Sequence, residues 1–79
     1  MIIAEMWTES RTWISRGKTI RGAKEALRRA WNTEQERLKK DRKRYGFDHI
    51  PVICKTVSDL ENLYDISIYD LTASDVVII

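Results

Sequence analysis

The sequence predicts a small α+β domain in which short strands form a mixed sheet packed on one long, basic, amphipathic helix. Three observations support this fold class. The chain has 79 residues, which leaves room for one hydrophobic core and a single domain over 1–79. Helix-forming residues with apolar side chains every three or four positions run through its middle. Short apolar, β-branched segments lie on both sides of that pattern.

The N-terminal part predicts a β-hairpin. Residues 2–7 are apolar and too short for a helix, and residues 12–15 read as a second short strand before Gly17. The connection lacks the Asn-Gly or Asp-Gly pair of the tightest hairpin turns. We expect Trp7 and Trp13 in the core, because a small domain needs large apolar side chains. On the outer face they would instead mark a protein-binding patch.

Residues 19–45 predict one long helix. Thr19 is placed to cap its N-terminus, and Gly46 is placed to end it. About 26 residues would span roughly 39 Å, which is longer than the core of so small a domain. We therefore expect the last two turns, from about Lys39, to project. The apolar residues at helical spacing are Ile20, Ala23, Leu27, Ala30, Trp31 and Leu38.

The C-terminal part predicts further strands at 50–55, 66–70 and 75–79. A capping box that begins at Ser58 indicates a short helix at 58–64. The element order is then β-β-α-β, extended by an α and a β element. A helix-turn-helix over residues 58–73 remains the alternative to helix plus strand, although four acidic residues and no basic one make that stretch a poor DNA reader.

The charge of the chain is polarised. Residues 11–44 hold thirteen of the fourteen Lys and Arg against four acids, a net charge of +9, whereas residues 46–79 carry −5. Arrays of this kind attract phosphate backbones, because each neutralised phosphate releases a counterion. The same charges also suit a solvated helix face that the acidic half neutralises. The residues expected to bind a partner are Arg21, Lys24, Arg28, Arg37, Lys39, Lys40, Arg42, Lys43 and Arg44.

Residues for catalysis, cofactor binding or metal binding are not predicted. His49 is the single histidine, and Cys54, five positions later on the predicted strand, would face the other side. The run Gly17 to Thr19 resembles the end of a phosphate-binding loop, but Thr12 stands where that loop needs a glycine. Zinc ligands at the usual short spacing are missing from the sequence. We expect a non-enzymatic protein.

Location and partner class follow from the same composition. A single cysteine excludes an internal disulfide and fits a reducing, cytoplasmic setting, and no apolar run approaches the roughly 20 residues that cross a bilayer. Two function classes stay open. One is an accessory protein that binds nucleic-acid phosphates without sequence preference. The other is a protein-binding module or inhibitor, of the type that phages and mobile elements encode, docking its basic helix and exposed Trp on an acidic surface. Self-association through residues 76–79 is a third.

Overall fold

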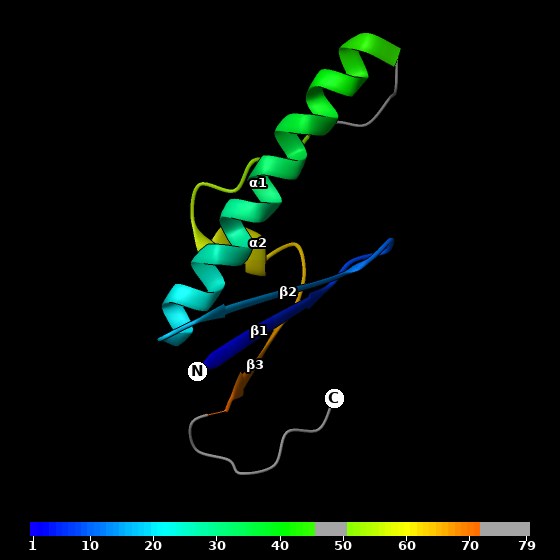
Figure 1. Cartoon of the computed structure of the whole chain (residues 1–79). Helices are drawn as coiled ribbons and strands as arrows, with labels where there is room; N and C mark the ends of the chain where they lie inside the picture. Colours follow the sequence, from blue (N-terminus) through cyan, green and yellow to red (C-terminus); the bar gives the residue numbers. More distant parts are fainter. Residues whose placement is uncertain (46–50, 72–79) are drawn as a thin grey trace.

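The fold is an α+β arrangement of a small sheet and a long helix, as the sequence predicts. The computed structural model describes residues 1–45 and 51–71, without the side chains of 42–45. Its elements are β1 (Ile2–Trp7), β2 (Thr12–Gly17), α1 (Ile20–Tyr45), α2 (Val57–Glu61) and β3 (Ile66–Asp70). Figure 1 shows the N-terminal half of α1 beside the sheet and its C-terminal half extending past it, with α2 next to α1.

The sheet has β1 at its centre, in the order β2-β1-β3. Both pairings are antiparallel, so the sheet of the described strands is antiparallel rather than mixed. Ile2, Ala4 and Met6 alternate along β1 and are buried. Because successive side chains of a strand point to opposite faces, these three define the face that packs on α1. The opposite face is called the outer face below.

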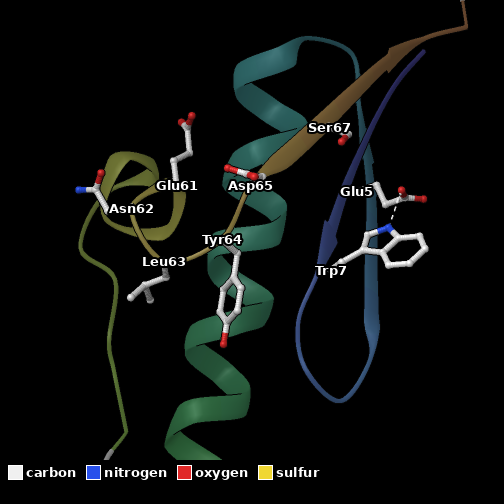
Figure 2. Close-up of a pocket in the computed structure, with 8 residues that line it drawn as sticks. All are labelled: Glu5, Trp7, Glu61, Asn62, Leu63, Tyr64, Asp65 and Ser67. Atoms are coloured by element: carbon white, nitrogen blue, oxygen red, sulfur yellow. Dashed lines mark hydrogen bonds between the residues drawn. The ribbon is translucent and has the colours of Figure 1, made fainter.

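The hairpin is confirmed, and its connection explains why no glycine turn is needed. The Thr8 N–H donates to the Arg11 carbonyl at 2.9 Å, and the Thr8 hydroxyl exchanges further hydrogen bonds with the same backbone. Trp13 packs against the core as predicted, but the core position predicted for Trp7 is wrong. Trp7 is 68% exposed on the outer face, where its indole N–H donates to Glu5 at 2.7 Å (Figure 2).

Helix α1 begins where the sequence predicts. The Thr19 hydroxyl accepts the Gly22 N–H at 3.0 Å, which satisfies one of the free donors of the first turn. Gly17, at the end of β2, lies directly against this turn. A Cβ atom at Gly17 would lie 2.6 Å from the Ala23 nitrogen, so only glycine lets strand and helix come this close. Beside it, the Ser15 hydroxyl donates to the Ala23 carbonyl.

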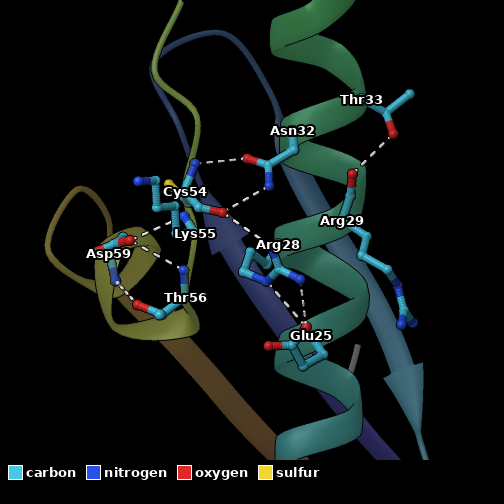
Figure 3. Close-up of polar contacts among 9 residues, drawn as sticks. All are labelled: Glu25, Arg28, Arg29, Asn32, Thr33, Cys54, Lys55, Thr56 and Asp59. Carbon is cyan, nitrogen blue, oxygen red and sulfur yellow. Dashed lines mark hydrogen bonds and ion pairs between the residues drawn. The ribbon is translucent and has the colours of Figure 1, made fainter.

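The predicted strand at 50–55 is wrong, because residues 51–54 run along α1 without joining the sheet. Side chains of the helix take the place of a neighbouring strand. The Asn32 amide accepts the Cys54 N–H and donates to the Cys54 carbonyl, both at 2.8 Å (Figure 3). Two other helix side chains hold Val52: Trp31 donates to its carbonyl at 2.9 Å, and Gln35 accepts its N–H at 3.1 Å.

The segment after this connection is a helix followed by a strand, and not a helix-turn-helix. The capping box of α2 begins at Thr56, two residues before the predicted one, and its partner is Asp59. Short helix α2 ends at Glu61, and β3 follows where the sequence predicts it. The predicted strand at 75–79 lies outside the described residues.

Trp31 is the centre of the core. Its ring centroid lies 5.9 Å from that of Trp13 and 5.6 Å from that of Tyr64. These rings join the hairpin, the helix and the turn after α2, and Cys54 and Leu60 are fully buried in the same core cluster. Trp31, on the predicted apolar stripe of the helix, is buried in the core, and Cys54 is buried beside it.

Replacing Asn32 by alanine is expected to lower the free energy of unfolding by about 2 kcal/mol, since it removes two hydrogen bonds and leaves the Cys54 N–H without its partner. Urea denaturation measures this. Thr33→Ala is the matched control, because Thr33 is exposed and bonds only within the helix. Equal midpoints for the two variants would show that the Asn32 bonds carry no stability.

Gly17→Ala is expected to cost about 1–3 kcal/mol, because the added methyl group meets helix backbone that cannot move aside. Gly22→Ala is its control. There the Cβ would lie 3.2 Å from the Thr19 hydroxyl, a side-chain atom and not backbone, and alanine favours the helix. Thermal unfolding should therefore separate the two glycines, and a Gly17→Ala protein as stable as wild type would contradict the close packing.

Candidate functional site

The nine basic residues predicted to bind a partner divide into three groups in the structure. Arg28, Lys24 and Arg37 already have carboxylate partners within the chain. Arg21, Lys39 and Lys40 are exposed and form no ion pair within residues 1–45 and 51–71. The side chains of Arg42, Lys43 and Arg44 lie outside the described part of the chain.

Arg28 is a structural residue. Its guanidinium donates two hydrogen bonds to Glu25, at 2.9 and 3.0 Å, and a third to the Cys54 carbonyl at 3.0 Å. That carbonyl also accepts from Asn32, so Arg28 completes the attachment of the connection to α1 (Figure 3). Such an arginine is unavailable to a phosphate unless the connection detaches.

Lys24 and Arg37 are occupied at the protein surface. The Lys24 ammonium lies 3.5 Å from the Glu61 carboxylate and so links α1 to α2. Arg37 bridges Glu34 and Asp41, at 2.5 and 2.8 Å, along its own helix. Exposed pairs of this kind contribute little stability and are screened by salt, so both cations can exchange partners at small cost.

The remaining exposed cations lie on the side of α1 that faces solvent. Arg21 and Lys39 are eighteen residues apart, which is about five full helical turns, so both lie on the same side of α1. Their positions along the helix axis are roughly 27 Å apart. Arg29, which the sequence analysis did not include, and Lys40 lie on the adjoining solvent side. We call these four residues the basic face.

A shallow hollow of about 390 Å³ lies at the N-terminal end of the basic face. Arg21 and Lys24 line it from α1, and Lys55 and Ser58 line it from the connection and α2. The sequence does not predict that Lys55 lies beside Arg21 and Lys24, because residue 55 falls in a predicted strand of the sheet. Lys55 is the only lysine or arginine among residues 46–79, so the sequence pattern does not connect it with the basic helix.

The C-terminal half of α1 leaves the core at about Gln35. Gln35 is the last buried residue of the helix among those with described side chains, and the hairpin reaches only as far as Arg11, 3.9 Å from Glu34. The predicted projection is therefore present (Figure 1). Residues 39–45 carry five basic residues and one acid, so the projecting end has a net charge of +4.

Ion pairing changes the acidity of two glutamates on α1. Hydrogen bonding to Arg28 lowers the pKa of Glu25, and hydrogen bonding to Arg37 lowers the pKa of Glu34. In turn, the pKa of each arginine is raised. Burial raises the pKa of the Cys54 thiol, which suits a core residue rather than a nucleophile.

Across 1–45 and 51–71, His, Cys, Asp and Glu side chains do not gather in a group of three that could hold a metal ion. None of the described helices is long and apolar enough to cross a bilayer.

Comparison with known proteins gave no relative to guide the assignment. No family model matches the chain, and no similar curated protein or solved structure was found. The geometry of this chain alone therefore carries the functional argument.

Glu34 is expected to titrate below the ordinary glutamate pKa, since its charged form is stabilised by Arg37. A depressed native pKa means that this contribution to stability is complete above the unfolded value of about 4.3 and is lost as the pH falls through the native pKa. NMR titration of the side-chain carboxyl measures it. In Arg37→Gln most of the shift should vanish, while Glu25 keeps its own.

Proposed function

We propose that this protein is a non-enzymatic accessory protein that binds the phosphate backbone of nucleic acid through α1. The observation that carries the proposal is the projecting, strongly basic end of a helix whose exposed lysines have no carboxylate partner in the described structure. Phosphates are the anions that such a surface would neutralise most effectively, because they occur as a regular array.

The basic face favours backbone contacts over the reading of bases. Its four cations spread over roughly 27 Å of helix, and Glu25 and Glu36 lie between them, so the surface is a broken line of positive charge. Base reading requires side chains that present paired donors and acceptors to base edges, and α1 offers mainly lysine and arginine there. The expected binding is therefore independent of sequence.

The second function class is a protein-binding module that uses the basic helix and an exposed tryptophan together. Trp7 fits the description of an exposed tryptophan, but it is on the outer face, away from α1, and next to Glu5. One acidic partner surface would attract α1 and be repelled around Trp7. This separation is why we place nucleic acid first.

Fluorescence anisotropy of a labelled duplex and a labelled single strand, titrated at several salt concentrations, tests the proposal. Affinity should fall steeply with salt, with a log–log slope of about −4 to −6 for five or six phosphates. Changing both Lys39 and Lys40 to glutamate should weaken binding at least tenfold and make the slope shallower by about 2.

The matched control is Arg16→Glu with Lys18→Glu, which makes the same change in net charge at exposed residues of β2 and the turn that follows. If the control weakens binding as much as the helix variant, overall charge and not α1 is responsible. Absence of binding even at low salt contradicts the proposal and leaves the protein-binding class as the one to pursue.

A further inference from the structure

A hollow of about 570 Å³ lies between the sheet and the turn after α2, and none of the four residues of the basic face lines it. Glu5, Trp7 and Ser67 line it from the outer face, and residues 61–65 line it from the other side (Figure 2). Proposed phosphate binding makes no use of this place, because its charge is of the wrong sign.

Three carboxylate side chains line the hollow: Glu5, Glu61 and Asp65. Its lining residues include no Lys or Arg. Lys24 offsets one of them through its 3.5 Å contact with Glu61. Glu5 and Asp65 have no cation within ion-pair distance in the described structure. The hollow therefore keeps an excess of negative charge that a cation would neutralise.

Aromatic side chains give the hollow a second property. Trp7 is 68% exposed, and its hydrogen bond to Glu5 fixes the indole beside a carboxylate. The ring of Tyr64 packs edge-on against Trp31, with 5.6 Å between the two ring centroids. Cations are attracted to the faces of such rings, and an arginine side chain, which is planar and weakly hydrated, is suited to stack on tryptophan while bonding a carboxylate.

Apolar surface continues from the hollow across the outer face. Ile14 stands opposite Glu5 in the β1–β2 pairing and is 65% exposed, and Tyr69 is exposed on β3. Large apolar side chains gathered on an exposed sheet face are typical of an interaction surface. An occupant should therefore carry an apolar residue close to its cation.

We propose that the hollow is a docking site for an arginine side chain of a partner protein, with Trp7 as the stacking surface and Glu5 and Asp65 as the counter-charges. Complementary charge selects this occupant: a phosphate or an acidic peptide would be repelled. The proposal is independent of nucleic-acid binding, since the hollow shares no lining residue with the basic face and carries the opposite charge.

NMR spectra of the ¹⁵N-labelled full chain test the proposal, with a blocked Gly-Gly-Arg-Gly-Gly peptide as the probe. The same peptide with citrulline is its control, because citrulline keeps the shape of arginine and lacks the charge. The arginine peptide should shift the Trp7 indole signal and the amides of residues 61–67 in a saturable manner. The citrulline peptide should bind about tenfold more weakly.

Two variants assign the effect to the hollow. Trp7→Leu should weaken arginine-peptide binding about tenfold, and Asp65→Asn should weaken it about threefold. Both residues are exposed, so the spectra should otherwise show an unchanged fold. Glu36→Gln removes one exposed carboxylate from α1 and should leave the affinity as it is.

Three results would overturn the inference. The first is equal binding of the arginine and citrulline peptides. The second is a pattern of shifts that maps outside the hollow, or that Glu36→Gln reduces as strongly as Asp65→Asn does. The third is movement of the same signals on dilution of the protein without peptide, which would give the site to a second copy of the chain.

Discussion

The pair of hydrogen bonds between the Asn32 amide and the backbone of Cys54 is the constraint on which much of this structure depends. Among the described residues, 51–54 have no strand beside them, so the N–H and carbonyl groups of this segment require other partners. Asn32 satisfies both groups of one residue. These two hydrogen bonds keep Cys54 in the core, and α2 follows directly after it beside α1. The chain then continues into β3, which pairs with the edge of β1 that β2 leaves free.

The same connection explains how the chain divides its charges. Arg28 holds the Cys54 carbonyl on α1, whereas Lys24 makes a weaker surface contact with Glu61 of α2. Cations that face solvent, such as Lys39 and Lys40, remain for a partner. In the described C-terminal half, Glu61 pairs with Lys24 of α1, Asp59 caps α2, and Asp65 lines the hollow beside the outer face. The basic face of α1 and the acidic hollow thus lie on different parts of the surface.

The sequence was informative where local pattern decides structure. Helical spacing and the Thr19 cap predicted α1, a short apolar run predicted β1, and alternation of apolar residues predicted β3. The strand expected at 50–55 was wrong because an apolar run satisfies its backbone either in a sheet or on helix side chains, and periodicity does not distinguish the two. A signal was present in Gln35, a polar residue four positions after Trp31 on the apolar stripe, since a buried amide needs a partner. The ion pairs of Arg28 and Arg37 lie at i,i+3 and i,i+4 spacing, and alternation along β1 places Trp7 on the face of Glu5, so the sequence held a signal for both. The contact between Lys24 and Glu61 joins two separate helices, and spacing along the chain does not encode it.

The central place of β1 has a consequence for the order in which the fold assembles. Its pairing with β2 joins neighbours in the sequence, but its pairing with β3 joins Ile2 to Asp70 and must close a loop of most of the chain. On a ribosome, the hairpin and the first half of α1 can collapse early, whereas the other edge of β1 waits for residue 70. During that interval one side of the central strand offers unpaired backbone groups to any other extended chain. The growing polypeptide is therefore most exposed to mispairing along β1.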